Sequence, residues 1–462
     1  MLSLHSQEGK LRAADNLLPR ADGSLCTRPG AVQIFDGSVD LALPWGNSVL
    51  LQSRGRLWLV ANGTVQDFGV QGRTLSVAPY QALIADGKRE NRLYVADGVN
   101  PLWYIRRNGA TYERVDVINL VTDDSGVPFP LPIPKILCNW SNRLWIGDGT
   151  NRIQHCQNER PEEWDPLWVL EFQGDTQAAV VAMMPHAGNL MVALENSLWQ
   201  VAGTSQYNWT VQEALHGFGV IGAQAMVSDG NTLATISRHG VHLNGAAQSV
   251  ADDLRELFLV PQIGAQVVID PKRRLLLLSL AGRVFVMHLD NPGQFSEISR
   301  IGIRGVVALY DDWGFYDIEG LWLIGRLNIG DQASNGTQTP ITTRYDTWEA
   351  QPNVNNSGRA LLDRLRLGIA GIPGKTAHYQ ATVDDTMVFW ADISLSNEDP
   401  ALWGQVPYAD SQKWPPRMVW RELSPKLAGT FFRHTLVCSD YIEIKSFLPE
   451  YRFGLPVKGI PA

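Results

Sequence analysis

The sequence is organised around Asn91-Arg92-Leu93-Tyr94-Val95-Ala96-Asp97-Gly98, a pattern that recurs as Asn142-Arg143-Leu144-Trp145-Ile146-Gly147-Asp148-Gly149. Each copy contains a turn, a strand of leucine, β-branched and aromatic residues, and a second turn. The closing Asp-Gly predicts a tight hairpin whose two central residues take positive φ. Weaker copies lie along the chain, and the leucines that align all copies are Leu57, Leu93, Leu144, Leu190, Leu233, Leu276 and Leu321. Their spacing of about 36 to 51 residues is typical of β-propeller blades.

Three regions are expected from this pattern. Residues 1–30 have little periodicity and end in a turn, which predicts an N-terminal docking arm. Residues 31–345 carry the repeats and predict a propeller of six or seven blades, with three or four strands in each. Residues 346–462 alternate differently and predict a C-terminal β-domain. The fold class is therefore all-β, with one helix expected at residues 249–258 from a Ser N-cap and helical apolar spacing.

Net charge, cysteine spacing and the N-terminal residues argue against several classes of function. The 462 residues carry a formal net charge of −8 and show no Lys/Arg cluster, so tight, sequence-independent binding to nucleic acid is not expected. The four cysteines lack CxxC spacing, which predicts reduced core thiols instead of a zinc site or a disulfide framework. The N-terminus lacks the pattern of a signal peptide and no stretch is long enough to span a bilayer, so we expect synthesis in the cytoplasm.

Candidate metal ligands have simpler structural explanations. Asp97 and Asp148 could ligate calcium, but their neighbours do not supply five or more oxygens at the required offsets. A turn role explains both residues. His239 and His242 would project to opposite faces of a strand, which argues against a metal site. We therefore expect no metal and no cofactor.

Signatures of catalysis are also weak. Carboxylates such as Asp311, Asp312 and Glu319 could act as a pair on a glycosidic bond. However, the chain has no Ser-x-Asp-x-Gly-x-x-Trp box, no Gly-x-Ser-x-Gly elbow and no Walker-type loop. We expect a protein that is not an enzyme and has no catalytic residues.

The tryptophans divide into two groups. Trp58, Trp145 and Trp322 occupy equivalent positions in the repeat, which predicts core packing between blades, although sugar-stacking platforms are the alternative. Trp403 and Trp414 lie in a long loop rich in Pro, Asp and Gln. We expect these two to contact a neighbouring subunit or a receptor.

Five short strings follow one another along the chain. They are Asn16-Leu17-Leu18-Pro19 leading to Arg28-Pro29-Gly30; Glu159-Arg160-Pro161-Glu162-Glu163-Trp164-Asp165; Gly217-Phe218-Gly219-Val220-Ile221-Gly222; Gly240-Val241-His242-Leu243-Asn244-Gly245 before the expected helix; and Val419-Trp420-Arg421-Glu422-Leu423-Ser424-Pro425 running into Ile444-Lys445-Ser446-Phe447. In this order they resemble the nozzle proteins of short-tailed bacteriophages, the family that includes tail tubular protein B and the packaged DNA stabilisation proteins. The resemblance spans nearly the whole chain.

The resemblance implies a structural protein of the virion tail, assembled in the host cytoplasm. Its implied partners are five other copies in a hexameric ring, the adaptor of the head–tail connector, tail fibre or spike proteins, and genomic DNA that passes through the lumen without tight binding. The acidic balance suits such a conduit, because each luminal Lys or Arg would add a phosphate contact. Contacts with the adaptor or neighbouring subunits are expected at Arg28, Pro29, Gly30, Trp403 and Trp414.

Two other functions remain open from the residues alone. A glycan-binding or glycan-hydrolysing propeller predicts an exposed cluster of aromatic and carboxylate side chains at the mouth of one monomer. A cellular scaffold propeller predicts a monomer with a partner-binding face.

Overall fold

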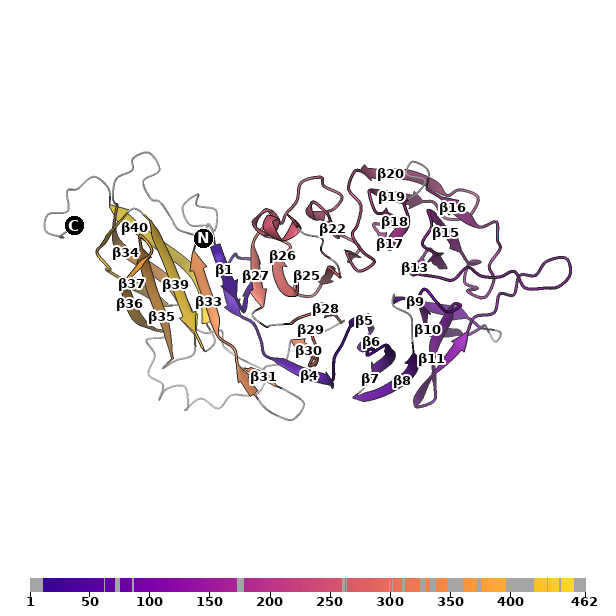
Figure 1. Ribbon diagram of the computed structural model, residues 1–462, viewed down its shortest axis with the longest axis horizontal. Coiled ribbons are helices and arrows are strands. Elements are labelled where there is room, and N and C mark those ends of the chain that lie inside the picture. The colour runs from indigo at the N-terminus through magenta and orange to yellow at the C-terminus, as the bar shows by residue number, and fades with distance from the viewer. Residues whose placement is uncertain are drawn as a thin grey trace. The chain divides into compact units, whose positions relative to one another are not determined.

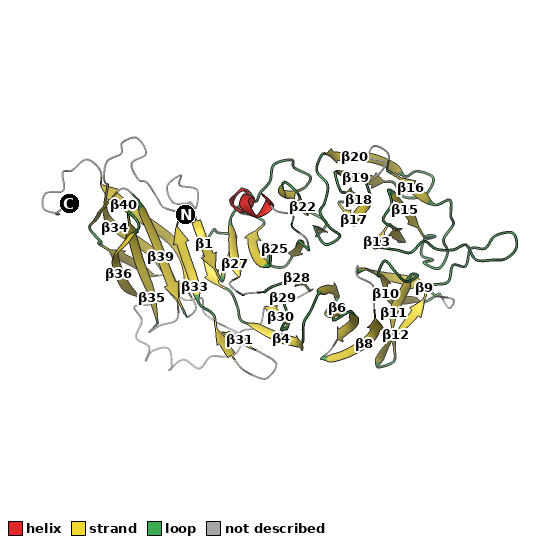
Figure 2. Cartoon of the chain, in the orientation of Figure 1, coloured by secondary structure: helices red, strands yellow, loops and turns green. Residues whose placement is uncertain are grey.

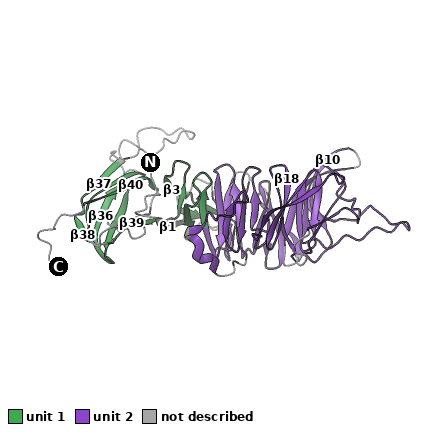
Figure 3. Ribbon diagram, turned by 90° about the horizontal axis from the view of Figure 1, so that it is seen from above, with its two compact units in different colours: residues 1–32, 285–299, 324–462 green, residues 33–284, 300–323 purple. Residues whose placement is uncertain are grey.

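Short β-strands form nearly all of the secondary structure in this computed structural model (Figure 2). The chain divides into two compact units (Figure 3). We call residues Gln33–Val284 and Arg300–Leu323 the propeller unit, and residues Met1–Val32, Phe285–Ser299 and Ile324–Ala462 the sandwich unit. The structure describes residues 11–61, 63–70, 75–84, 87–172, 178–259, 262, 264–298, 300, 302–309, 312–324, 330–332, 338–347, 360–371, 375–395, 419–429, 431–439 and 442–452.

Seven antiparallel sheets follow one another around the described part of the propeller unit (Figure 1). The first four are β5 (Leu41–Trp45), β6 (Ser48–Ser53), β7 (Arg56–Ala61) and β8 (Thr64–Val70); β9 (Ser76–Leu83), β10 (Arg89–Ala96), β11 (Trp103–Asn108) and β12 (Thr111–Asp116); β13 (Ile136–Trp140), β14 (Arg143–Gly147), β15 (Arg152–His155) and β16 (Val169–Glu171); and β17 (Val180–His186), β18 (Asn189–Leu194), β19 (Ser197–Ala202) and β20 (Thr210–His216). The other three are β21 (Met226–Ser228), β22 (Leu233–Ser237) and β23 (Gly240–Leu243); β24 (Gln266–Asp270) and β25 (Leu275–Leu280); and β28 (Gly305–Ala308), β29 (Trp313–Tyr316) and β30 (Gly320–Ile324) with β4 (Ala31–Asp36).

The ring of sheets closes on itself. The first strand of each sheet from β9 onward contacts the first strand of the next, and β28 in turn contacts β5. The first two sheets share a core that contains Leu50, Leu93 and Trp103. The seventh sheet is completed by β4, which comes from the other end of the propeller sequence. Just after β4, the Gly37 and Val39 amides donate hydrogen bonds to the carbonyls of Glu319 and Asp317 in the turn between β29 and β30. The fold class is therefore confirmed: the chain is all-β, with a propeller of seven blades.

The seven leucine anchors are buried, but they do not all lie on the same strand of their blades. Leu93, Leu144, Leu190, Leu233 and Leu276 lie on second strands, whereas Leu57 and Leu321 lie on the third strands β7 and β30. The first spacing of the repeat is short because it runs from the third strand of one blade to the second strand of the next. Trp145 is fully buried in the core between the third and fourth sheets, as predicted.

The predicted Asp-Gly hairpins are replaced by another kind of turn. Gly98 has φ of 72°, but Asp97 does not have positive φ, and six residues separate β10 from β11. The buried Asp97 carboxylate instead accepts hydrogen bonds from the backbone N–H groups of Val99 and Asn100, at 3.0 and 2.7 Å. This is an Asx turn, which caps the strand end and satisfies backbone donors without a two-residue loop.

The expected helix is present, although it is a 3₁₀-helix, η1 (Asp252–Leu259). The helix begins three residues after Ser249, so Ser249 is not its N-cap residue. The Ser249 hydroxyl instead accepts a hydrogen bond from the Ala251 amide at 3.0 Å, in the turn that leads into the helix. The long proline-rich segment between β12 and β13 is an exposed loop, and an isolated β-bridge joins Thr122 and Pro128 within it.

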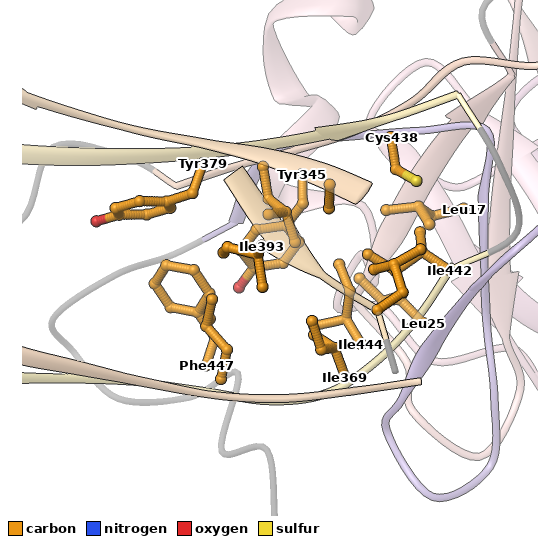
Figure 4. Packing of buried hydrophobic residues seen from close by; sticks show 14 of the residues in the cluster. Leu17, Leu25, Tyr345, Ile369, Tyr379, Ile393, Cys438, Ile442, Ile444 and Phe447 are labelled. Atoms are coloured by element: carbon orange, nitrogen blue, oxygen red, sulfur yellow. The ribbon is translucent and has the colours of Figure 1, made fainter. Parts of the chain in front are cut away.

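The sandwich unit contains two packed sheets. One sheet includes β27 (Phe295–Ile298), β1 (Leu11–Asp15), β33 (Thr343–Thr347), β39 (Phe432–Cys438), β35 (Thr376–Val383) and β36 (Thr386–Ser394), with β26 (Arg283–His288) beside β27. The other includes β2 (Leu17–Pro19), β3 (Leu25–Thr27), β40 (Ile442–Arg452), β34 (Ala360–Gly371), β37 (Val419–Leu423) and β38 (Leu427–Gly429). A short hairpin of β31 (Gly330–Gln332) and β32 (Gln338–Pro340) also belongs mainly to this unit. Figure 4 shows the core between the sheets, where Tyr379 and Ile393 approach Phe447 and Ile444.

The units divide the sequence differently from the expected arm, propeller and C-terminal domain. Residues 11–32 are strands of the sandwich unit, not a separate arm, because β3 pairs with β40 through Leu25 and Ile444. Residues 324–345 belong to the same unit, since β33 pairs with β1 and β39. The sandwich is therefore built from both ends of the sequence, and its C-terminal strands fall where alternation predicted them.

Candidate functional site

A cavity of about 600 Å³ opens on the propeller unit across its first three sheets. Turns and strand ends supply the lining, mainly from the hairpins β5–β6, β9–β10, β11–β12 and β13–β14. The residues are Trp45, Gly46, Ser48, Pro79, Tyr80, Gln81, Arg89, Asn91, Arg92, Arg107, Tyr112, Asn139, Asn142 and Glu159. Its volume falls in the range of about 300–1,000 Å³ that small-molecule sites have.

One wall of the cavity is aromatic. The rings of Trp45 and Tyr112 meet edge to face with their centroids 5.6 Å apart. Gln66 holds the backbone of Tyr112 from both sides, because its amide donates to the Tyr112 carbonyl at 2.5 Å and accepts from the Tyr112 N–H at 3.1 Å. Both rings are partly exposed, so they present a fixed apolar surface to the cavity.

The floor is held in place by hydrogen bonds to the backbone. The Tyr80 hydroxyl donates to the Asn142 carbonyl at 2.7 Å, and the Asn139 side chain donates to the Pro79 carbonyl at 2.9 Å. Burial raises the pKa of Tyr80, so this hydroxyl stays a neutral donor. Within the described part of the chain, the exposed side-chain amides of Gln81, Asn91 and Asn142 make no hydrogen bond to the protein.

The three arginines of the lining differ in their charge partners. Arg92 is buried and forms ion pairs with Glu90 and Glu162, and Arg89 pairs with Glu159 at 2.5 Å. Arg107 is exposed and donates through Nε to the Gly109 carbonyl at 3.0 Å. No described carboxylate forms an ion pair with Arg107, so its charge is uncompensated at the rim of the cavity.

The predicted partner contact at Arg28 lies inside the sandwich unit instead. Arg28 is 3% exposed. Its guanidinium forms a bidentate ion pair with Asp331, with both N–O distances 2.8 Å, and donates to the Asn16 side chain at 2.9 Å. Asp331 also accepts from the Ala31 amide at 2.9 Å. The Arg28 side chain therefore stabilises this unit and is not available to an adaptor, because its donors point inward.

The other predicted contact residues are less informative. Gly30 is buried and Pro29 is partly buried beside Arg28. Trp403 and Trp414 lie outside the residues that the structure describes.

The residues considered for metal binding have structural partners. His242 is buried, with Nε2 2.8 Å from the Ser237 hydroxyl and Nδ1 3.0 Å from the Ala246 carbonyl. Asp148 accepts from the Thr150 amide at 2.9 Å, as a turn cap. Across the described ranges, no three His, Cys, Asp or Glu side chains gather as metal ligands would. The four cysteines are buried and free, as the sequence predicts.

The carboxylates considered for acid–base chemistry give a similar result. Glu319 pairs with Arg300 at 2.7 Å, and Asp311 lies outside the described residues.

No helix in the described part of the chain is long and apolar enough to cross a bilayer.

A second surface feature lies on the sandwich unit, at the edge formed by β36 and β37. Among the described strands, each is the last of its sheet. The Arg421 guanidinium of β37 donates to the Ser394 carbonyl of β36 at 2.9 Å, which joins the two edges. Four large apolar side chains are exposed on these strands, and we call them the edge strip: Met387, Val388, Trp390 and Trp420, which are 57%, 46%, 70% and 54% exposed.

Sequence reasoning found neither the cavity nor the edge strip. The cavity residues come from separate hairpins with no common spacing. One signal was present, since Asn91 and Asn142 occupy the same position in the two clearest repeats, and both line the cavity.

Comparisons with known proteins add little to this geometry. No family model matches the chain, and no curated protein matches it. Among solved structures, the computationally designed Ika8 protein aligns with a TM-score of 0.39 and 8% identity, over 64% of this chain and 99% of that chain. A chain from the Mitotic Checkpoint Complex aligns with a TM-score of 0.39 and 13% identity, over 65% of this chain and 93% of that chain. Likenesses this distant carry no argument about function.

Proposed function

We propose that this protein is a non-enzymatic structural subunit of a homo-oligomeric ring, and that the ring is the tail nozzle of a short-tailed bacteriophage. In this role it extends the channel of the portal and adaptor, retains packaged DNA and conducts it during ejection. The observation that carries the oligomeric part is the edge strip. The tail assignment rests on the ordered strings of residues that resemble the nozzle family.

The edge strip has the properties of an interaction surface. An edge strand presents unpaired backbone groups, and soluble proteins usually protect such edges with charges, bulges or proline. The β36 strand has an irregularity of the β-bulge kind at Val388, yet it exposes Met387, Val388 and Trp390, and Trp420 is exposed on the neighbouring strand β37. Exposed apolar groups of this kind mark contact sites. A head-to-tail contact between identical subunits generates a closed ring when its rotation closes.

The charge of the chain suits the passage of DNA. The formal net charge is −8. Cationic groups facing a lumen would bind phosphates and slow the movement of DNA, whereas an acidic or neutral wall does not. The acidic balance therefore supports a conduit and argues against a protein that grips DNA.

Oligomeric mass is the direct test. The purified full-length chain, alone and then mixed with the adaptor protein of the same virion, is measured by light scattering and imaged by electron microscopy. We expect rings with an axial channel. A protein that stays monomeric in both samples contradicts the proposal.

Two matched variants locate the contact. The double substitution Trp390→Ser and Trp420→Ser removes the largest side chains of the edge strip. Burying each such side chain contributes about 1.5–3 kcal/mol, so the double variant should dissociate at concentrations at which the wild type is a ring. The control is Leu167→Ser with Tyr207→Ser, which removes two side chains of the propeller unit that are 85% and 90% exposed. Equal dissociation of both variants, or of neither, would remove the edge strip from the interface.

A further inference from the structure

We propose that the cavity on the propeller unit binds an oligosaccharide that carries a carboxylate, and that Arg107 recognises this group. The inference goes beyond the ring-forming role and does not depend on it, because every residue it uses lies in the propeller unit. It would make the propeller a recognition module as well as a structural part.

The aromatic wall suits the apolar face of a sugar ring. A pyranose presents C–H groups on one face and hydroxyls at its rim, so it packs against an aromatic surface and leaves its hydroxyls free for polar partners. Trp45 and Tyr112 provide such a surface, and their edge-to-face packing keeps it fixed in the absence of ligand. A fixed surface loses little side-chain entropy when the ligand binds.

The amides of the floor suit the hydroxyls of the sugar. Each carboxamide offers an acceptor oxygen and two N–H donors, which match adjacent hydroxyls that both donate and accept. Gln81, Asn91 and Asn142 line the cavity with side-chain amides that no described protein group occupies. An apolar ligand would leave these groups without partners, at a cost in affinity.

The charge at the rim selects an acidic sugar. The carboxylates of Glu90, Glu162 and Glu159 already neutralise Arg92 and Arg89. The terminal nitrogens of Arg107 have no such partner among the described residues, whereas its Nε donates to the Gly109 carbonyl. A guanidinium with its planar donor pair free is suited to a bidentate contact with a carboxylate.

The cavity is suited to binding and not to cleavage. Glycosidases use two carboxyl groups placed on either side of the scissile bond. Among the described residues, Glu159 is the one carboxylate that lines the cavity, and it is held by Arg89 at 2.5 Å. A single, ion-paired carboxylate cannot supply both the acid and the base or nucleophile.

The test uses the full-length protein on a printed panel of neutral and acidic oligosaccharides, the acidic ones bearing uronic or sialic acid residues. Positive glycans and their carboxyl-reduced counterparts are then titrated by calorimetry. We expect retention by acidic glycans, and a loss of affinity of at least about tenfold when the carboxylate is reduced, since hydrogen bonds between charged groups are the strongest kind. No retention by any acidic glycan, or equal affinity for the reduced form, overturns the proposal.

Variants separate recognition from general charge. Arg107→Gln should weaken binding of the acidic glycan about tenfold and leave binding of its reduced form unchanged. Arg238→Gln makes the same change of charge at an exposed arginine in the turn between β22 and β23 and should have no effect. Asn91→Ala, at an exposed side chain with no described partner, should weaken both forms without changing thermal stability. Equal effects of Arg107→Gln and Arg238→Gln would exclude specific recognition.

Discussion

The buried imidazole of His434 should make the sandwich unit sensitive to acid. Its Nδ1 lies 2.7 Å from the Tyr379 hydroxyl and its Nε2 lies 3.0 Å from the Tyr451 hydroxyl. Burial lowers the pKa of His434 from 6.5 to about 4. The unfolded chain therefore takes up a proton at a higher pH than the folded chain does. The resulting stability is present above pH 6.5 and is lost as the pH falls from 6.5 towards 4.

The size of this effect follows from the two pKa values. The lowered pKa corresponds to a total loss of about 3 kcal/mol, of which about 1 kcal/mol is lost between pH 7.5 and 5.5. Urea unfolding of the wild type and of His434→Gln, followed by circular dichroism at both pH values, measures the difference directly. The free energy of unfolding of the variant should fall by about 1 kcal/mol less than that of the wild type.

A matched control makes the result specific. His216 is exposed on the propeller unit, so His216→Gln removes a histidine without removing a buried one. This variant controls for the loss of a histidine side chain as such. If His434→Gln keeps the wild-type pH dependence, the reasoning about the buried imidazole is refuted.

Three further substitutions test interactions inside the individual units. Arg28→Ala leaves the buried carboxylate of its ion pair without a counter-charge and should lower the free energy of unfolding by about 3–5 kcal/mol in urea titrations; a loss below about 1 kcal/mol would contradict this. Asp97→Ala removes the acceptor of two backbone N–H groups and should cost about 1–3 kcal/mol by the same measurement, whereas no change in midpoint would show that the turn forms without it. Gly219→Ala would place a Cβ against the Glu195 carbonyl oxygen and should therefore lower the melting temperature. The control Gly222→Ala, whose Cβ meets nothing within 4 Å, should not lower it. Equal melting temperatures of the two variants would argue against the close approach.

Local periodicity was sufficient to identify the blades. Each blade is built from strands that are near neighbours in sequence, so a leucine flanked by apolar residues and turns marks it reliably. The second and third strands of a blade carry similar apolar patterns, however. Leu57 and Leu321 therefore aligned with the other anchors although they lie one strand further out.

The sandwich unit could not be assembled from the sequence in the same way. Its strands near Leu25 and Ile444 are paired across almost the whole chain. Alternation indicates that a strand exists, but it carries no information about a partner hundreds of residues away. For this reason residues 11–32 looked like an arm, and Arg28 looked like a surface contact.

The candidate cavity was missed for a related reason. Its lining comes from four hairpins of three sheets, and each hairpin supplies one or a few polar residues of types that are common in turns. Only the packing of neighbouring blades brings Trp45, Asn91 and Asn142 to one place. The sequence signal of such a site is a turn residue that recurs at the same position beside the repeat anchors, as Asn91 and Asn142 do.

The pairing of the chain's distant ends also orders events during synthesis on the ribosome. The Thr27 hydroxyl exchanges hydrogen bonds with the backbone of Ile442, 415 residues further along. While the propeller sequence is translated, β3 therefore has its partner β2 but lacks β40 on its other side. The edge strands β36 and β37 emerge in the same late interval. Nascent chains that stop before β37 lack this edge. Under the proposed ring contact, such chains would be unable to join a ring, and the order of translation would exclude incomplete copies.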